Sequence, residues 1–444
     1  AMSFWTDVFG PRRTFDGGLF LPDCKSETAR LPIETVPADG PLRVPLQAMR
    51  CLPTRPCVCV GQRVLAGQPL AEAATADAVP VHAPTSGTIT AFENVWTAVD
   101  GTLPGVCLEP DGEIRAMRPS IGWEDESFIF HLAGMGVVSA APRQAAHRLI
   151  QDAIAAGVTD LIVNAMETEP YLTTDLRLLV EQPGRLVDAA CEIADAMGVQ
   201  RVLFALPFRH RRLIRQIEVE TFARSVEAVP LSNKYPQCHP VVLIRTLLDR
   251  EVPPGGRDVD CAALVLSVAT VAAIADATLD DRPVTHAVAT VGGEVAERPG
   301  TYRIPIGMPI RRLAEHVGLT EPTAMTISGG PLTGVVIDRD DAVVTADTVG
   351  ILFLTPPARP DPVPCVHCGW CVEDCPVGLD PTALMQLDGQ ATCDPMDSFR
   401  LRACVDCGLC SYVCPANLPI AATIGRCRNR LVEDAPPAEA ETRQ

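Results

Sequence analysis

The spacing of apolar residues predicts an α/β domain over residues 126–281. An apolar stripe at helical spacing within residues 143–157 predicts an amphipathic helix. It is followed by a buried strand at residues 160–164, and a second helix and strand are predicted at residues 186–197 and 202–206. Because strands alternate with helices, we expect a Rossmann-like parallel sheet, with its ligand crevice at the carboxyl ends of the strands.

Residues 41–125 follow a different pattern, that of short apolar runs broken by Gly and Pro. Such closely spaced strands indicate a small β-sandwich. The pattern resembles the barrel-sandwich fold of biotinyl and lipoyl carrier domains, but the turn at Pro84–Gly87 has no Lys to modify. We therefore expect a structural role for this domain, with docking to a partner as the alternative.

Four further segments complete the predicted multidomain organisation, after an N-terminal segment at residues 1–40. Residues 282–345 read as short strands around a helix at 310–317, a β-grasp (SLBB-like) unit. A Pro-rich linker at residues 346–364 leads into a C-terminal domain at residues 365–432. The tail at residues 433–444 is rich in Pro, Ala and Glu and is predicted to be disordered.

Composition and charge exclude several classes of function. Acidic residues outnumber basic ones by 55 to 37, and a net charge of -18 repels a nucleic-acid backbone. The longest uncharged apolar run, Cys261–Ala275, is shorter than the roughly 20 residues that span a bilayer. The first thirty residues have no apolar core of a signal peptide, so we expect the chain to stay in the cytoplasm. Only Lys25 and Lys234 among the 37 basic residues are lysines, which suggests that something requires them.

The C-terminal domain carries the same cysteine motif twice. The motif has Cys residues after spacers of two, two and three residues and then Pro, and it runs from Cys365 to Pro376 and again from Cys404 to Pro415. In two-cluster ferredoxins the first three thiolates of such a motif hold one [4Fe-4S] cluster and the fourth holds the other. Zinc also binds paired cysteines, but a site with four ligands would not require a third Cys at a two-residue spacing and a Cys-Pro after three residues in both motifs. We therefore predict two [4Fe-4S] clusters in a helical ferredoxin-type domain. The first would be held by Cys365, Cys368, Cys371 and Cys414, and the second by Cys404, Cys407, Cys410 and Cys375.

Together these segments resemble the C subunit of Rnf-type electron transport complexes over nearly the whole chain. Its middle domain is also similar to the NADH-binding flavoprotein subunit of respiratory complex I. The stretches that carry the resemblance, besides the cysteine motifs, are Phe15–Gly18, Asn164–Tyr171 with Asp175 and Arg177, Lys234–Gln237 and Ser328–Pro331.

The resemblance implies a middle domain that binds FMN, accepts a hydride from NADH and passes single electrons to the clusters. Asn164 would face the flavin, while Glu167 and Glu169 would line the nicotinamide side. Lys234 would belong to the same cofactor site. The alternative for Asn164 and Glu167 is that a strand end uses them to cap the following helix, and for Lys234 that it is a solvated loop charge.

One loop departs from the family pattern. The family carries a glycine-rich loop whose backbone amides approach the FMN phosphate, and a Lys follows this loop. Here Gly134 and Gly136 remain, but Val137 and Ser139 replace two glycines and no Lys follows. Valine does not readily adopt the positive φ that glycine allows, and its methyls occupy the space of a phosphate. Arg143 or His147 would have to supply the missing charge.

Three hypotheses follow from these residues. The first is an electron-transfer subunit that connects an NAD(H)/FMN site to a partner through two clusters, acting as an NADH-dependent oxidoreductase within a complex. The second is a flavin-free adaptor that relays single electrons from a ferredoxin or flavoprotein without NADH chemistry. The third is an assembly subunit whose clusters only stabilise the fold. The family resemblance implies membrane-integral partner subunits that hold the chain at the inner membrane.

Overall fold

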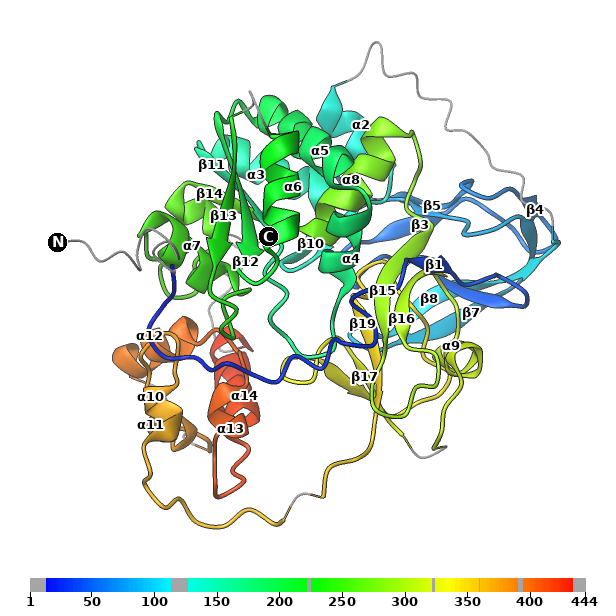
Figure 1. Cartoon of the computed structure of the whole chain (residues 1–444). Helices are drawn as coiled ribbons and strands as arrows, with labels where there is room; N and C mark the ends of the chain where they lie inside the picture. The colour runs from blue at the N-terminus through cyan, green and yellow to red at the C-terminus, as the bar shows by residue number, and fades with distance from the viewer. Residues whose placement is uncertain are drawn as a thin grey trace. The chain divides into compact units, whose positions relative to one another are not determined.

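The computed structural model describes residues 13–112, 127–221, 225–321, 324–358, 360–389 and 394–433. The chain divides into two compact units (Figure 1). The large unit contains residues 22–231 and 262–356, and the small unit contains residues 1–21, 232–261 and 357–444. The predicted α/β domain at residues 126–281 is therefore divided, because residues 232–261 belong to the small unit.

The first part of the large unit is a β-sandwich, as predicted. One antiparallel sheet has the order β2-β8-β7-β4 and the other the order β3-β5-β6. The long hairpin of β7 and β8 forms its spine, with a register shift between Ile89 and Ala91. The strands are β2 (Leu42–Pro45), β3 (Thr54–Pro56), β4 (Arg63–Val64), β5 (Pro69–Ala73), β6 (Val81–His82), β7 (Gly87–Thr97) and β8 (Gly101–Pro110). The end of the predicted domain, residues 113–125, lies outside the described residues.

The α/β part of the large unit is built on a four-stranded parallel sheet in the order β13-β12-β11-β14. Its strands are β11 (Asp160–Asn164), β12 (Arg201–Pro207), β13 (Val226–Leu231) and β14 (Ala263–Ser267). Its helices are α2 (Phe128–Gly134), α3 (Ala146–Ala155), α4 (Thr174–Glu181), α5 (Pro183–Met197), α6 (Arg211–Glu220) and α8 (Val268–Leu279). Asn164 and Ser267 are paired at the carboxyl ends of adjacent strands, so this edge of the sheet has polar side chains.

The third part of the large unit is a mixed six-stranded sheet with one helix, in the order β1-β16-β15-β19-β17-β18. The elements are β1 (Glu34–Thr35), β15 (His286–Gly292), β16 (Gly300–Pro305), α9 (Ile310–Val317), β17 (Met325–Ser328), β18 (Val335–Ile337) and β19 (Gly350–Leu354). The predicted linker at residues 346–364 therefore begins too early, since β19 is a fully buried strand between β15 and β17. The predicted N-terminal segment also contributes, because β1 pairs in parallel with β16.

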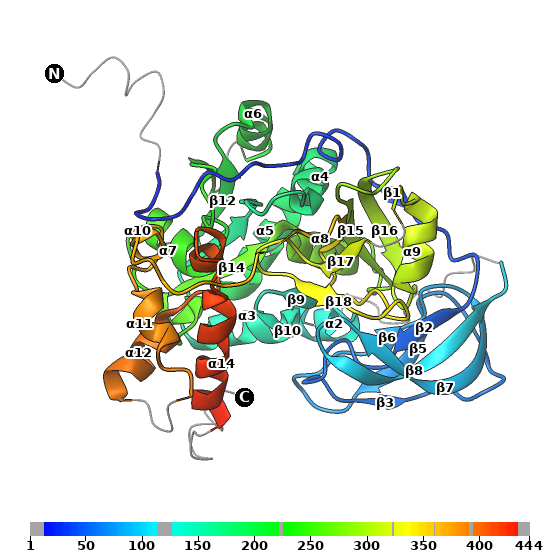
Figure 2. The same ribbon diagram turned by 90° about the horizontal axis from the view of Figure 1, so that it is seen from below.

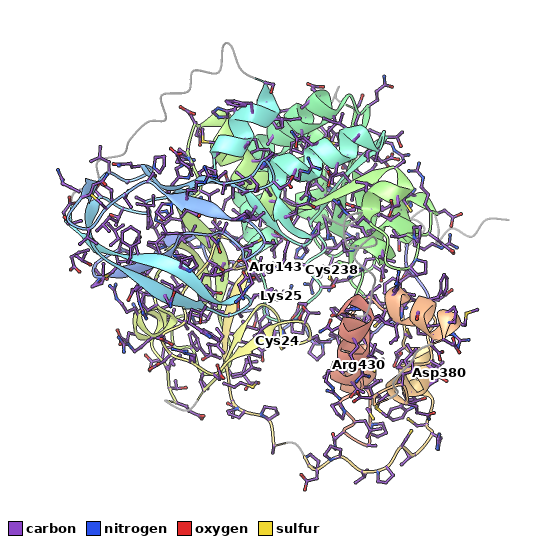
Figure 3. The ribbon with its side chains drawn as sticks, turned by 180° about the vertical axis from the view of Figure 1, so that it is seen from behind. Cys24, Lys25, Arg143, Cys238, Asp380 and Arg430 are labelled. Atoms are coloured by element: carbon purple, nitrogen blue, oxygen red, sulfur yellow. The ribbon has the colours of Figure 1, made fainter. Side chains whose placement is uncertain are left out.

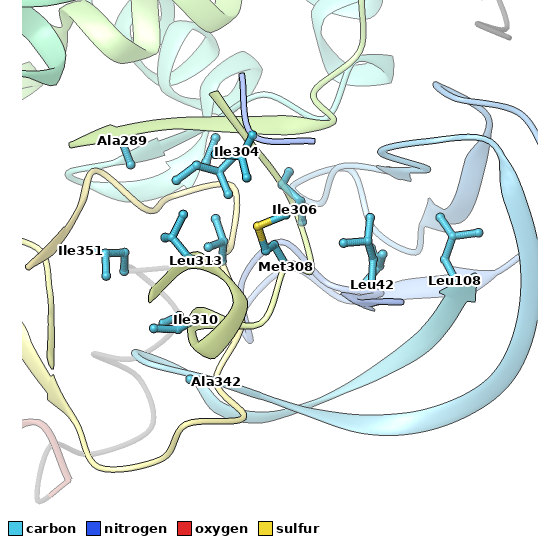
Figure 4. Packing of buried hydrophobic residues seen from close by; sticks show 14 of the residues in the cluster. Leu42, Leu108, Ala289, Ile304, Ile306, Met308, Ile310, Leu313, Ala342 and Ile351 are labelled. Carbon is cyan, nitrogen blue, oxygen red and sulfur yellow. The ribbon is translucent and has the colours of Figure 1, made fainter. Parts of the chain in front are cut away.

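One hydrophobic core joins the β-sandwich to this mixed sheet (Figure 4). Leu42 and Leu108 of the sandwich belong to the same buried cluster as Ile304, Leu313 and Ile351 of the sheet and its helix. Figure 2 shows the sandwich strands beside α9 and β16. The two predicted domains are thus packed as one body.

The small unit is built from short helices around a small core. They are α7 (Pro240–Leu248), the 3₁₀ turn η2 (Asp258–Cys261), α10 (Trp370–Glu373), α11 (Pro381–Met385), α12 (Pro395–Ala403), α13 (Leu409–Tyr412) and α14 (Ile420–Glu433). The buried side chains of this core are Cys371, Leu384, Leu401, Ile420, Ile424 and Cys427. The tail predicted to be disordered starts at the last residue of α14, and residues 434–444 lie outside the described residues.

Candidate functional sites

The eight cysteines of the doubled motif line two cavities in the small unit. Cys365, Cys368, Cys371 and Cys414 line the first cavity, of about 130 Å³. Cys375, Cys404, Cys407 and Cys410 line the second, narrower cavity, together with Cys371. Each cavity thus has the first three cysteines of one motif in its lining together with the fourth cysteine of the other motif, and Cys371 lines both cavities. We call these cavities the first and second cysteine cavities.

The backbone of the two motifs repeats residue by residue. Gly369 and Gly408 have φ of 81° and 77° and begin the short helices α10 and α13. His367 and Asp406, each two residues after the first Cys of a motif, have φ of 54° and 51°. These left-handed residues turn each ligand loop around its cavity. The same sequence pattern therefore produces the same local fold twice.

The electrostatic surroundings of the thiols follow the same division into two groups. Burial, with a smaller contribution from neighbouring Cys375, raises the pKa of Cys404 to about 11. Burial likewise raises the pKa of Cys407 and Cys410 to about 12. The pKa of Cys371 is raised by burial, by Asp380 and by Cys368 and Cys414. Four thiolates around one such cavity would require positive charge between them, which a bound metal cluster would supply.

The cysteines are not arranged as ligands of a single ion. In the described ranges, no group of three or more His, Cys, Asp or Glu side chains is placed to hold one metal ion. A zinc site needs four sulfurs that converge to about 2.3 Å from one point. Cysteines spread around a cavity suit a cluster, in which each Cys binds a different iron.

The second cysteine cavity is packed against the segment Phe15–Gly18. Gly17 has φ of 68°, and a Cβ atom there would lie 2.6 Å from the carbonyl oxygen of Cys375. The amide of Gly18 donates a hydrogen bond to the carbonyl of Asp374 (2.9 Å). Only a residue without a side chain allows this approach of the two backbones.

Lys234–Gln237 packs beside the same segment. The Lys234 Nζ donates to the carbonyl of Phe15 (2.9 Å) and lies 4.8 Å from the centre of the Phe15 ring. The buried Tyr235 donates from its hydroxyl to the carbonyl of Cys407 (2.6 Å). Lys234 therefore has partners within the small unit, while the other predicted cofactor residues belong to the large unit.

In the large unit, Asn164 and Glu167 bond to backbone amides. The Asn164 side-chain oxygen accepts from the amide of Met166 (3.0 Å). The Glu167 carboxylate accepts from the amides of Asp175 and Leu176 (3.1 and 3.4 Å), in the first turn of α4. The Asp175 carboxylate in turn accepts from the amide of Ala269 at the start of α8 (2.8 Å). These carboxylates thus cap two helices, and for Glu167 this is the alternative that the sequence left open, whereas Asn164 bonds within its own loop.

Lys25 is a buried cation beside these carboxylates, and sequence reasoning did not place it there. Its ammonium donates to the carbonyl of Glu167 and is 4% exposed. Its charge lowers the pKa of Glu167, Glu169 and Asp175, although burial has the larger effect and the net shift of each pKa is upward. Burial and the neighbouring Glu167 raise the pKa of Asp175 to about 8. The available signal was the rarity of lysine in this chain.

Glu169 connects the α/β part to the loop Ser328–Pro331 and the residues after it. Its carboxylate accepts from the hydroxyl of Thr333 and from the amide of Leu332 (3.1 Å). A Cβ atom on Gly330 would overlap the Glu169 carboxylate oxygen. Two of the segments that carry the family resemblance therefore meet here in a structural contact.

The loop at residues 134–142 does not present a phosphate site. Val137 and Ser139 are fully buried, and Ser139 donates to the carbonyl of Ala141 (3.2 Å). Strands β9 (Val138–Ala140) and β10 (Arg143–Ala145) pair as a hairpin. A Cβ on Gly136, whose φ is 77°, would lie 2.9 Å from the carbonyl of Pro80. The loop is therefore filled by its own side chains and packed against the sandwich.

The two cations that could replace the missing Lys already have partners. Arg143, labelled in Figure 3, is bound by the carboxylates of Asp100 (2.7 Å) and Asp347 (2.8 Å). His147 bonds to the carbonyl of Ala76 (2.9 Å), and burial lowers its pKa, so it is neutral at pH 7. Neither residue is placed to meet the charge of a phosphate, so the residues present at this loop do not fit FMN.

The large unit contains a cavity of about 350 Å³ that the sequence did not predict. It lies between α8 and the mixed sheet, and its charged lining includes Asp276, Arg282 and Arg303. Asp276 is paired with both of these arginines and with Arg185. The volume is at the lower end of the range for small-molecule sites.

Family comparisons define the class of protein. Residues 13–113 match the RnfC barrel sandwich hybrid domain, and residues 139–276 match the Nuo51 FMN-binding domain. This confirms the predicted barrel sandwich and the complex I-like middle domain. The second match begins at Ser139, after Gly134 and Gly136.

The chain is RnfC-like, and the resemblance stated from its sequence is confirmed. The C subunit of the ion-translocating oxidoreductase complex of Yersinia enterocolitica is 33% identical over 389 residues, which are 83% of this chain and 55% of that protein. The corresponding subunit of Edwardsiella ictaluri is 33% identical over 430 residues, 91% of this chain and 52% of that protein. The chain thus spans about half the length of the curated relatives it matches.

Among solved structures, a NAD+-reducing [NiFe]-hydrogenase in its H2-reduced state aligns with 69% of this chain and 60% of its own. The TM-score is 0.47 and the sequence identity is 17%. In the part of the chain that the structure describes, no helix is both long and apolar enough to cross a membrane.

Proposed function

We propose that this chain is an electron-transfer subunit of an Rnf-like redox complex and holds two [4Fe-4S] clusters. The observation that carries the proposal is that Cys414 lines the cavity of the first motif, while Cys375 lines the cavity of the second. The first cavity would use Cys365, Cys368, Cys371 and Cys414, and the second Cys375, Cys404, Cys407 and Cys410. Bound clusters would supply single-electron transfer.

The residues around the cavities support this role. Apolar side chains contribute to both linings, Leu384 and Ile424 in the second cavity and Ile420 in the first. Tyr235 and Gly17 fix the backbone of Cys407 and Cys375 on one side. Such packing keeps ligand positions constant between redox states, which lowers the reorganisation that accompanies electron transfer.

The partners in this proposal are the other subunits of the complex. The matching relatives are named as subunits of an ion-translocating complex, which supports integral membrane partners for this chain. The chain would lie on the cytoplasmic side of the inner membrane and be held there by these subunits. A ferredoxin or flavoprotein would be its electron-exchange partner.

Iron content and a ligand variant test the clusters. Anaerobically purified protein is expected to contain about eight iron atoms per chain, as two cubanes require. Cys414→Ser should remove the cluster of the first cavity. Part of the iron and the electron paramagnetic resonance signal of the cluster in the second cavity should remain. Cys427→Ser is the matched control, because Cys427 is buried in the same core but lines neither cavity. Colourless, zinc-loaded protein prepared without oxygen would contradict the assignment.

A specific observation favours the flavin-free form of this function. The loop at residues 134–142 is filled, and Arg143 and His147 are engaged elsewhere. The chain would then relay single electrons without NADH chemistry. The opposing candidate, an NADH-dependent oxidoreductase with FMN beside Asn164, Glu167 and Glu169, is supported by the match to the Nuo51 FMN-binding domain.

Flavin release and NADH reduction separate the two candidates. Acid-treated protein is expected to release no flavin absorbance, and NADH should not bleach the clusters, whereas dithionite should. The double substitution Val137→Gly and Ser139→Gly should leave both results unchanged, because the charge of the missing Lys stays absent. Stoichiometric FMN with rapid bleaching by NADH would establish the opposing candidate.

A further inference from the structure

The two cysteine motifs have the same fold but different exposure. Trp370 in the first motif is 52% exposed, while Leu409 at the equivalent position of the second is 1% exposed. All residues from 366 to 370 are exposed, whereas in the second motif only Asp406 of the corresponding five is. An exposed Trp between two cysteine ligands is costly to leave in water, so it indicates a contact surface.

The exposed apolar residues cover the first cysteine cavity directly. Val366 and Val372 line this cavity and are 61% and 42% exposed, so the cavity lies immediately below the surface. The second cavity is covered within the small unit by Gly17 and Tyr235. One cavity therefore faces outward and the other faces the chain's own segments.

The surroundings of the first cavity are acidic. Residues 360–389 contain five Asp or Glu and no Lys or Arg. Asp361 and Glu373 are exposed beside the apolar residues in sequence, and Asp380 acts electrostatically on Cys371. Residues 394–433, which carry the second motif, contain four Asp or Glu and five Arg, so their charges nearly balance. The negative field is thus concentrated on the outward-facing motif.

We propose that Val366, Trp370 and Val372 form the docking surface for a one-electron redox protein whose cofactor edge is apolar and ringed by Lys or Arg. The inference rests on the proposed function. One electron crosses this surface between the first cysteine cavity and the partner, one side being oxidised and the other reduced, with no bond or proton exchanged. The acidic rim steers the partner and the apolar residues exclude water from the contact.

Electron transfer to a basic acceptor tests the surface. The cluster-loaded full chain, reduced with dithionite, is mixed with oxidised cytochrome c, a basic one-electron acceptor, in a stopped-flow instrument. The rate should fall at least fivefold from 20 to 200 mM salt. Trp370→Ser and Glu373→Lys should each lower the low-salt rate at least threefold. Val336→Ser and Glu315→Lys change an exposed valine and an exposed acid in the large unit, so they serve as controls and should leave the rate unchanged.

Further measurements keep the outcomes distinguishable. A neutral water-soluble quinone as acceptor should react at the same rate with all variants, which shows intact clusters. Unchanged cytochrome c rates in Trp370→Ser and Glu373→Lys, with iron and quinone rates preserved, overturn the docking inference alone. Absence of clusters in wild type overturns the proposed function instead. A wild-type dimer that Trp370→Ser converts to monomer in sedimentation would assign the surface to a second copy and also overturn the inference.

Discussion

At the scale of single residues, Lys25 has the largest expected effect outside the cysteine motifs. It is buried beside Glu167 and Asp175, whose carboxylates cap two helices of the α/β part. Removing this buried cation takes away the favourable charge beside the Glu167 carboxylate and the hydrogen bond to the Glu167 carbonyl. Lys25 is therefore a structural cation, and no pattern of neighbouring residues in the sequence predicts this role.

We predict that Lys25→Met lowers the free energy of unfolding of the large unit by about 3 kcal/mol. Urea unfolding followed by circular dichroism measures this. Lys234→Met, which removes the chain's other lysine, should lower the free energy of unfolding of the small unit by about 1 kcal/mol. It loses one hydrogen bond and one contact with the Phe15 ring. Equal losses for the two variants would contradict the assigned role of Lys25.

Asp175 gives a prediction for pH dependence. Its pKa is raised from 3.8 to about 8, so between these values the unfolded chain is charged there while the folded chain keeps its proton. The folded state then binds more protons, and stability falls as pH rises through this window. Asp175→Asn removes this loss while its amide oxygen still accepts from Ala269. Its stability relative to wild type should increase by on the order of 1–3 kcal/mol from pH 5 to pH 8.5. A pH-independent difference in urea unfolding would show that Asp175 is ionised when folded.

At the scale of elements, the sequence predicted periodic segments well and short buried strands poorly. The strand at residues 160–164 and the helix at residues 310–317 have the predicted bounds. Helix α3 begins at Ala146 rather than at residue 143, because Arg143–Ala145 pairs with β9. The predicted linker includes strand β19, because a run of four apolar residues before a Pro-rich stretch has no periodicity that would indicate a strand. Its place between β15 and β17 depends on partners far away in the sequence.

The candidate sites divide in a similar way. The grouping of the cysteines is predicted from a local spacing, and the cavity linings place Cys414 with the first motif and Cys375 with the second. The packing of Phe15–Gly18 against Cys375, and the contact of Glu169 with Gly330, join residues that are far apart in the chain. A single sequence carries no signal for contacts between residues so far apart.

Gly330 provides a prediction for the connection between elements. Gly330→Ala places a methyl group in the space of the Glu169 carboxylate, so the loop or the carboxylate must move. We expect a loss of about 2 kcal/mol in the free energy of unfolding. Adding Glu169→Ala should recover part of it, which a double-mutant cycle measures. Gly425→Ala in α14 meets nothing within 4 Å and should not destabilise. Additive losses in the double variant would exclude the contact.

At the scale of the whole molecule, the two units differ in how their folds are held. The large unit has an extensive apolar core, whereas the helices that carry the cysteine motifs, of four to fourteen residues, surround a cluster of six buried side chains. So small a core supplies little stability by itself. Groups bound to the cysteines would therefore stabilise the small unit far more than the large one.

We predict two separate thermal transitions in calorimetry of the cluster-loaded protein. Removal of iron by chelation under reducing conditions should abolish the transition of the small unit or lower its midpoint temperature by more than 10 °C. The midpoint temperature of the large unit should shift by less than 2 °C. Limited proteolysis of iron-free protein should then cut within residues 357–433 first. A common shift of both transitions would mean that the units unfold together.

The exchanged fourth cysteine also determines when each cavity can be completed during synthesis. The first cavity needs Cys414, so it stays open after Cys365, Cys368 and Cys371 have left the ribosome. The second cavity needs Cys375, which is made early, but its other three cysteines come last. Neither quartet exists until nearly the entire second motif has emerged. A ribosome that stops between the motifs releases a chain in which neither cavity has its four cysteines, so under the proposed assignment a truncated product could not bind a full cluster.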